Sequence, residues 1–328
     1  MQNHKIVLGQ MTMTNSDILA DVKMESTINP STDLVLGGVC CRELKFSFNK
    51  NNTSPGKIKY FVDKNPFTYY FNDVLICTFY PYKMEENDTI ITVTSYDSMS
   101  LFDVNVDSWL NSLTFPMSVD DMITSLCTEC GVKAEKYDSS LGSSLVIQDN
   151  ITSTNLTGRQ VLSWLAQTIG CYAYMNKFSK LILKKFGSSS GFNFRTSNNC
   201  NVKKVTIAKF ETSPIDKLQI KQAEDDIGVI SGKGTNTMVI ENNPLLYAST
   251  TSELQTYADG MLDYVKDIVY VPVVVESYDY ADIPLGQYFT IDMSTKAICM
   301  SISQSASGFI YKCTGNQLRE NQVNQENM

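Results

Sequence analysis

Histidine, the residue that most often serves as a catalytic base, occurs once in this sequence, at His4. A Ser-His-Asp or Cys-His arrangement needs a positioned imidazole to activate its nucleophile. Catalytic zinc with histidine ligands needs several such rings. His4 lies in a weakly patterned stretch, residues 1–20, which we expect to form an arm or a first strand. The sequence therefore excludes these enzyme classes.

Two short motifs are similar to known binding sites. Cys127 and Cys130 have CxxC spacing, but zinc sites need a second ligand pair, and both thiols fall on the apolar side of a predicted helix. Residues 228–235 (GVISGKGT) resemble a phosphate loop, yet only three residues separate the first two glycines and Gly234 follows the lysine. We predict core packing for the cysteines and an ordinary turn for the glycines.

Carboxylates are the remaining residues that could do chemistry. Any two Asp or Glu that meet in space could act as acid and base on a glycosidic bond. Asp97, Asp120 and Glu276 are candidates only by default. Asp120 falls in the first turn of a predicted helix, where negative charge is stabilising. Because capping and turn roles explain such residues more simply, we predict no catalytic, cofactor-binding or metal-ligating residue, and no enzyme.

The charge of the chain limits its partners. The 328 residues carry a net charge of −8, which speaks against general binding to nucleic acid or to anionic membranes. The segment from Lys177 to Lys221 contains ten basic residues and only two acidic ones, Glu211 and Asp216. Its net charge is therefore +8, and that of the remainder is −16. The basic segment fits either contact with an acidic neighbour or, as we favour, solvated strand faces.

The sequence also indicates a compartment. Its N-terminus has no signal-peptide core and no apolar run is long enough to span a membrane, so we expect synthesis in the cytoplasm and no membrane insertion. Nine cysteines in that setting are expected to be reduced thiols.

Three helices and many short strands would position these residues. Thr157 and Gln160 form a capping box before a helix that ends at Gly170, and a hairpin follows it up to Phe186. Ser118 caps a second helix that Gly131 closes, and a third helix begins near Ser252. Alternating residues predict strands elsewhere, among them 22–28, 44–48, 57–62, 74–80 and 89–96.

The fold class predicted from these elements is α+β and mainly β. We expect a first β domain over residues 1–105, which may recruit strands after residue 196, and an inserted α/β domain over 106–190 with its helix and hairpin. A second β domain with one helix follows over 191–315, and a polar tail over 316–328.

Several segments in one order resemble the baseplate hub family of phage tails and contractile particles from Gram-positive hosts. Residues 35–48 (VLGGVCCRELKFSF) are similar to the family's LG-x-x-x-x-x-E-L-x-F strand, and residues 94–102 (TSYDSMSLF) to its Y-D strand end. Residues 116–131 and 157–186 resemble its helix and its helix with hairpin. In the C-terminal half the likeness is mainly one of layout, for instance at 284–291 (PLGQYFTI).

The resemblance implies a non-enzymatic structural adaptor. Hubs of this family are homotrimers in which each subunit carries two tube-like β-barrel or sandwich domains. Three subunits thereby join the hexameric tail tube, or a tube-initiator protein, to the trimeric central spike, beside other baseplate proteins. The protein would be assembled in the host cytoplasm and then reside in the baseplate of a virion or a bacteriocin particle. An acidic lumen suits DNA passage without specific binding.

Two other functions stay open for a tail component. One is a tail-associated cell-wall hydrolase that uses a carboxylate pair. The other is a carbohydrate-binding or receptor-binding tail module, for which residues 69–71 (YYF) and 278–280 (YDY) could supply exposed aromatic rings. We favour strand packing for both aromatic segments, because aromatic residues are common in strands.

Overall fold

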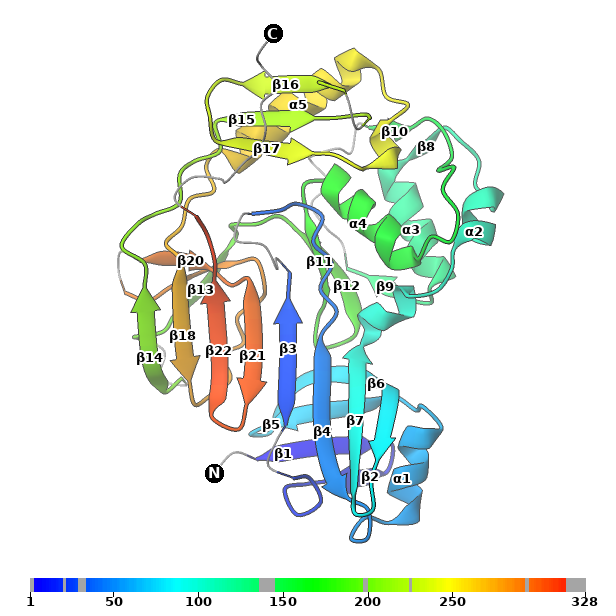
Figure 1. Ribbon diagram of the computed structural model, residues 1–328, viewed down its shortest axis with the longest axis vertical. Coiled ribbons are helices and arrows are strands. Elements are labelled where there is room, and N and C mark those ends of the chain that lie inside the picture. Colours follow the sequence, from blue (N-terminus) through cyan, green and yellow to red (C-terminus); the bar gives the residue numbers. More distant parts are fainter. Residues whose placement is uncertain are drawn as a thin grey trace.

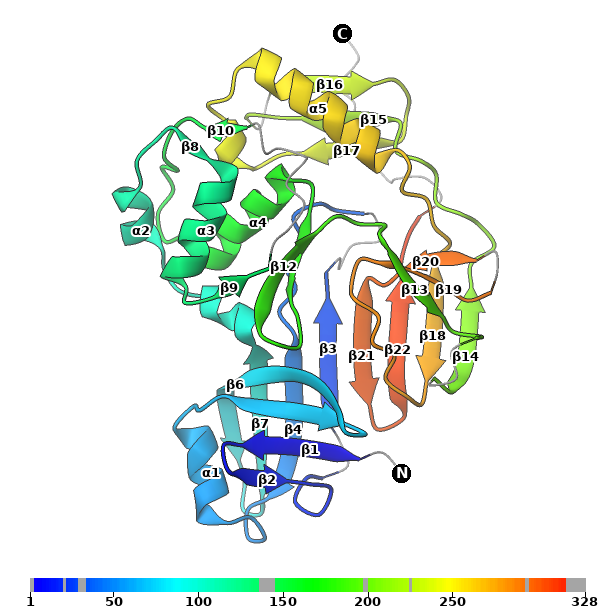
Figure 2. The same cartoon turned by 180° about the vertical axis from the view of Figure 1, so that it is seen from behind.

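The computed structural model describes residues 3–19, 22–28, 34–135, 145–196, 200–223, 226–292 and 295–316. Its largest element is a curled sheet of eleven strands, in which the strands at one end run across those in the middle (Figures 1 and 2). In order across the sheet these are β14 (Val202–Ile207), β18 (Val273–Ser277), β22 (Gly308–Cys313), β21 (Ser301–Ser305), β3 (Lys23–Thr27), β4 (Glu43–Asn49), β7 (Ile90–Asp97), β6 (Val74–Glu86), β5 (Phe67–Phe71), β1 (His4–Leu8) and β2 (Met11–Met13). The fold is α+β and mainly β, which confirms the predicted class.

Strands from the two ends of the chain meet in the middle of this sheet. β3 pairs antiparallel with β21, with Ser26 opposite Ile302, and β3 pairs on its other side with β4. The two β regions that flank residues 106–190 are therefore hydrogen-bonded to each other. The alternation that predicted these strands is confirmed, since Leu44, Phe46 and Phe48 are fully buried.

The predicted strand over residues 57–62 is wrong, because this segment belongs to helix α1 (Pro55–Val62). Pro55 occupies the first turn, where its missing N–H is not needed. Phe61 is buried between β4 and β5, where it contacts the rings of Phe46, Phe48 and Phe67. We call these four rings, with Phe79, the aromatic core. The helix is therefore held against the sheet by one buried ring, that of Phe61, and has no alternating buried face.

Residues 106–190, called the α/β unit below, pack three helices beside two small ladders (Figure 1). These elements are α2 (Asp107–Ser112), α3 (Val119–Glu129) and α4 (Gly158–Thr168), with β8 (Met117–Ser118), β9 (Lys133–Ala134), β10 (Val146–Ile147), β11 (Tyr172–Met175) and β12 (Lys180–Lys184). The Ser118 cap and the Thr157–Gln160 capping box are both present. Gly131 and Gly170, each with φ +67°, lie just beyond the ends of α3 and α4, as the sequence predicted.

A further layer lies above the α/β unit in Figure 1, where helix α5 (Thr251–Val265) covers a sheet of three strands. The strands are β15 (Lys217–Ile220), β16 (Val229–Gly232) and β17 (Thr237–Ile240). Asn243, which caps the short η2 (Pro244–Leu246), donates to the Trp164 and Gln167 oxygens of α4 at 3.1 and 3.0 Å. This amide fastens the layer to the α/β unit.

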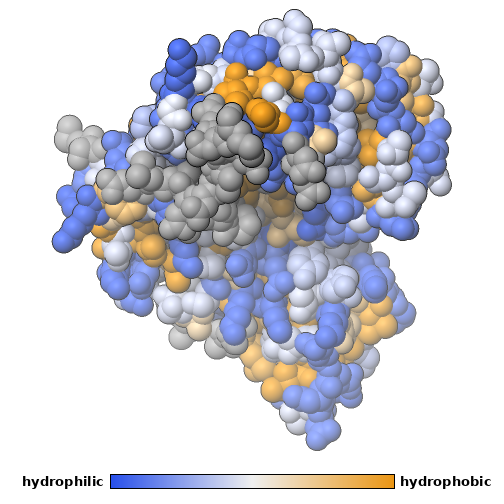
Figure 3. Space-filling view, turned by 45° about the horizontal axis from the view of Figure 1, so that its top comes forward, coloured by the Kyte–Doolittle hydropathy of each residue, from blue (hydrophilic) through white to orange (hydrophobic). Residues whose placement is uncertain are grey.

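A small sheet of β13 (Ser189–Asn193), β19 (Tyr288–Thr290) and β20 (Lys296–Ile298) completes the architecture. Among the described residues, no helix is long and apolar enough to cross a membrane. All nine cysteines are free, and all but Cys41 are buried. Hydrophilic residues predominate on the face in Figure 3, with separate apolar areas between them. The predicted polar tail lies outside the described residues from residue 317 onward.

Candidate functional site

The three candidate carboxylates do not form a catalytic pair. Asp97 ends β7, Asp120 lies in the first turn of α3, and Glu276 is on β18. In both views α3 and β18 lie on opposite sides of the molecule (Figures 1 and 2). Glu276 lies within 3.6 and 3.9 Å of two lysine Nζ atoms on the neighbouring strand β14, and Asp97 is buried.

The other motifs have structural positions as well. Cys127 and Cys130 are buried on α3, and burial raises their thiol pKa values to about 12 and about 11, which disfavours the thiolate that a metal needs. His4 is buried too, with Nδ1 2.8 Å from the Tyr69 hydroxyl. Of the two aromatic segments, 69–71 buries Tyr69 and Phe71 in the core, whereas Tyr278 is 52% exposed.

A hollow of about 620 Å³ lies where the large sheet meets the α/β unit, and we call it the junction hollow. It is lined by Tyr80, Pro81, Tyr82, Tyr96, Ser100, Asp103 and Arg159. Two tyrosine-bearing strands, β6 and β7, form one side, and the start of α4 contributes the arginine. The hollow therefore combines aromatic rings with an ion pair.

A β-bulge presents Tyr82 to solvent. Pro81 pairs with Ser95 and Lys83 with Thr94, so Tyr82 is the extra residue on β6. Bulges re-aim side chains, and proline is tolerated in a strand at such irregularities. The Tyr82 side chain is 65% exposed, and its ring meets that of Tyr96 edge-on at 5.4 Å between centroids.

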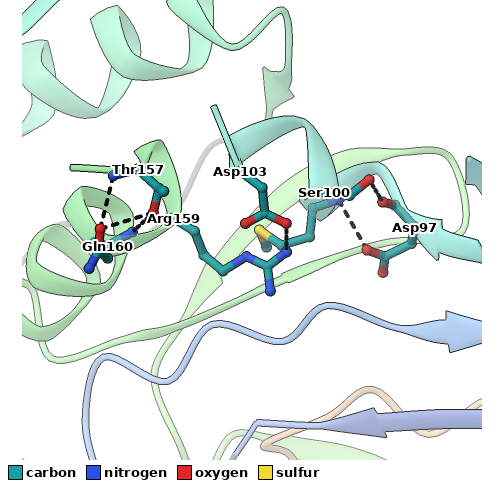
Figure 4. A network of polar contacts seen from close by, with 7 residues as sticks. Asp97, Ser100, Asp103, Thr157, Arg159 and Gln160 are labelled. Carbon is teal, nitrogen blue, oxygen red and sulfur yellow. Dashed lines mark hydrogen bonds and ion pairs between the residues drawn. The ribbon is translucent and has the colours of Figure 1, made fainter. Parts of the chain in front are cut away.

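The turn after β7 contributes Ser100 to the lining of the hollow, and Figure 4 shows its polar contacts. Asp97 Oδ1 accepts a hydrogen bond of 3.0 Å from the Met99 amide and so caps the 3₁₀ turn η1 (Ser98–Phe102). Ser100 Oγ donates to the Asp97 carbonyl at 2.8 Å. Burial raises the pKa of Asp97 to about 6, against the opposing effects of the Arg42 charge and the Met99 amide.

Arg159 and Asp103 form an ion pair across the hollow (Figure 4). Arg159 stands in the first turn of α4, which the Thr157–Gln160 capping box holds. Partial burial raises the pKa of Asp103, and the Arg159 charge opposes that rise. A Cβ on Gly158 would lie 3.0 Å from the Phe102 carbonyl, so the close contact between α4 and η1 that brings the pair together favours glycine there.

The hollow has the composition of a binding surface. None of its lining residues is a histidine, a cysteine or a lysine. Tyrosine and arginine are enriched in protein interfaces, where they supply most of the binding energy. Sequence reasoning missed this cluster. Pro81, directly after the predicted strand over 74–80, lies inside β6 and was a usable signal for the bulge.

Comparisons with known proteins show which solved structures share the fold of this chain. No protein-family model matches the chain, and no curated protein matches it significantly. Among solved structures, a 43 kDa tail protein of prophage MuSo2 from Shewanella oneidensis is 12% identical, with a TM-score of 0.58 over 96% of this chain and 98% of that chain. A tail protein from Neisseria meningitidis MC58 is 11% identical, with a TM-score of 0.58 over 97% of each chain. The chain thus has the fold of phage tail proteins along nearly its whole length.

Proposed function

We propose that the protein is the structural baseplate hub of a phage or phage-tail-like particle. The observation that carries this proposal is the fold likeness to two tail proteins, which spans nearly all of each chain. In the proposal, residues 1–105 and 191–315 supply two tube-like β domains, residues 106–190 are the inserted α/β domain, and 316–328 are a polar tail. The protein acts without catalysis.

The large sheet supports this role mechanically. Because β3 and β21 are hydrogen-bonded, the two β regions form one continuous sheet rather than two units on a linker. Three such subunits would present six β regions to a hexameric tail tube and a threefold face to the central spike, an arrangement in which symmetry fixes the interfaces. The net charge of −8 suits a channel that DNA passes without binding.

The junction hollow is the interface that we assign within this role. Its exposed Tyr82 and partly exposed Arg159 have the character of interface anchors toward a second subunit or another baseplate protein. The same rings favour a second candidate function, a carbohydrate-binding or receptor-binding tail module, because aromatic faces bind the apolar sides of ligands. No comparable observation favours the cell-wall hydrolase.

Native mass spectrometry of the purified chain, alone and with its cognate spike protein, tests the hub proposal. We expect a trimer, or a complex of three chains with three spike chains. A chain that stays monomeric and ignores the spike would contradict the proposal. A cleared band on host cell wall in zymography, abolished by changing one carboxylate, would replace it by the hydrolase.

Two tyrosine variants test the hollow itself. Tyr82→Ser should weaken the assembly, because it removes the exposed anchor without touching a buried ring. Tyr278→Ser, at a second exposed tyrosine, is the matched control and should leave assembly unchanged. Equal effects of the two variants would remove the hollow from the interface.

A further inference from the structure

A second, smaller cavity lies on another side of the α/β unit. It measures about 220 Å³ and opens between β6, the turn that joins β11 to β12, and the loop that precedes β19. Its lining includes Arg42, Ile76, Tyr174, Lys177, Tyr280 and Asp282. We call it the Arg42 pocket.

Arg42 is a buried cation whose hydrogen-bonding capacity is only partly used. The residue is 8% exposed, Nε donates to Ser26 Oγ at 2.9 Å, and Nη1 donates to the Ile76 carbonyl at 3.2 Å. A guanidinium carries five N–H donors. The thiol of Cys77 is a further neighbour that interacts with the guanidinium. Within the described part of the chain, no carboxylate lies within ion-pair distance of Arg42.

Asp97 interacts with the Arg42 charge but forms no ion pair with it. Asp97 is joined to Arg42 through the backbone, since the Asp97 amide donates to the Arg42 carbonyl at 2.9 Å, and its carboxylate caps the Met99 amide instead. Removing a charge from water is costly unless a partner compensates it. Among the residues that the structure describes, the guanidinium therefore has no ion-pair partner.

The rim of the pocket carries both charge and apolar surface. Lys177 Nζ and Asp282 Oδ2 lie 3.0 Å apart across it, with side chains 39% and 59% exposed. Phe178 is 65% exposed beside them, with Lys177 Nζ 5.8 Å from its ring centroid. An exposed phenylalanine next to an ion pair is the kind of rim that surrounds a protein contact.

The wall formed by the loop before β19 is fixed in place. Tyr172 Oη donates to the Leu285 carbonyl, and Gly286 has φ +71°. A Cβ on Gly286 would lie 2.2 Å from Cζ of Tyr172, so only glycine allows this approach. At the other end, Tyr311 Oη bonds both the amide and the carbonyl of Ala281. This wall of the pocket is therefore preformed.

We propose that the Arg42 pocket receives the carboxylate of a glutamate or aspartate side chain from a partner protein. A guanidinium binds a carboxylate through two parallel N–H···O bonds. A volume of about 220 Å³ is below the roughly 300–1,000 Å³ of small-molecule sites and suits one side chain. The acidic charge of the whole chain disfavours a nucleic-acid partner. This proposal holds whether or not the protein is a hub.

Methyl-labelled NMR of the full chain provides the test. The δ1 methyl groups of Ile76 and Ile283, which line the pocket, report binding, and that of Ile240 in β17 is the remote control. We expect the peptide acetyl-Gly-Glu-Gly-amide to shift the two pocket methyls saturably. Its glutamine counterpart should shift neither, because the amide lacks the charge.

Two surface variants have opposite expected effects. Lys177→Gln should weaken binding of the glutamate peptide about two- to fivefold, and Asp282→Asn should tighten it by a similar factor, in keeping with exposed charge pairs. Both residues are well exposed, so both variants should fold. Arg42→Met should abolish binding, whereas Arg159→Gln in the junction hollow should leave it unchanged.

Several outcomes would overturn the assignment. Equal shifts with the glutamate and glutamine peptides would show that charge is not recognised. Identical affinities in the Lys177 and Asp282 variants would place the binding elsewhere. Inorganic phosphate that moves the same methyl groups at lower concentration than the peptide would make the ligand a phosphate group instead.

Discussion

The aromatic core and the junction hollow both border β7 but are stabilised in different ways. The aromatic core is held by ring contacts that need no particular partner atom. The junction is held by a turn that Asp97 caps and by the Arg159–Asp103 ion pair. The first region depends on apolar burial, whereas the second also depends on directional polar contacts. Changes in the first region should cost stability, and changes in the second should alter geometry and pH response.

The largest effect should come from the aromatic core. Phe61→Ala removes a ring that is 1% exposed and should lower the free energy of unfolding by about 3–5 kcal/mol, measured by denaturant titration. Val62→Ala, at a neighbour that is 61% exposed, should change it by less than about 0.5 kcal/mol. Similar costs for both would mean that α1 does not dock through Phe61.

At the junction, Asp97 should make stability depend on pH. Its folded pKa of about 6 lies above the ordinary 3.8, so the folded state binds the proton more tightly and this group stabilises as pH falls from about 6 to 4. Asp97→Asn removes that dependence. Relative to the variant, the wild type should gain on the order of 2 kcal/mol between pH 7.5 and pH 4. The exposed Asp88→Asn is the control, and a constant difference would contradict the burial of Asp97.

His4, whose ring contacts those of Tyr69 and Phe71, should respond in the opposite direction. Burial lowers its pKa from 6.5, so stability is present above that value and is lost as pH falls through it. Chemical denaturation between pH 7.5 and 5 should show His4→Phe losing less stability than the wild type, with a smaller difference than at Asp97. Tyr69 keeps its bond of 2.9 Å from Gln304 in the variant. Parallel curves for variant and wild type would mean that His4 is accessible to protons.

The smallest effect should come from the Arg159–Asp103 ion pair. Its side chains are 30% and 46% exposed, so a double-mutant cycle should give a coupling of about 0.2–1 kcal/mol. The more exposed Lys83–Glu85 pair on β6 should give no measurable coupling. A stronger coupling in the second pair would show that the junction does not order its charges.

Local signals in the sequence predicted local structure. The Ser118 cap, the Thr157 capping box and the alternation at residues 44–48 are confirmed, because each depends on residues within one turn or one strand. The strand predicted over residues 57–62 is wrong, since KIKYFV alternates like a strand but its helical character depends on burial of Phe61 against β4 and β5.

The junction hollow could not be predicted in the same way. Long-range packing brings Asp103 to Arg159 and Tyr82 to Tyr96, and the distance in sequence between the two members of each pair matches no helix or strand period. The Arg42 pocket likewise depends on a loop more than two hundred residues away in the chain. Only Pro81 carried a local hint, as a proline that a regular inner strand would not tolerate.

The β3–β21 pairing also determines the order in which the chain can fold. On each side of the β3–β21 pair, most neighbouring strands are close in sequence. β3, in contrast, can pair with β21 only after residues 301–305 have been synthesised. Pairings with such large sequence separation are slow, because loop closure must precede the contact. Until then β3 presents an unpaired edge, a hazard for aggregation during synthesis. Truncation before β21 would leave that edge permanently open, so the last strands complete the sheet and also protect the first ones.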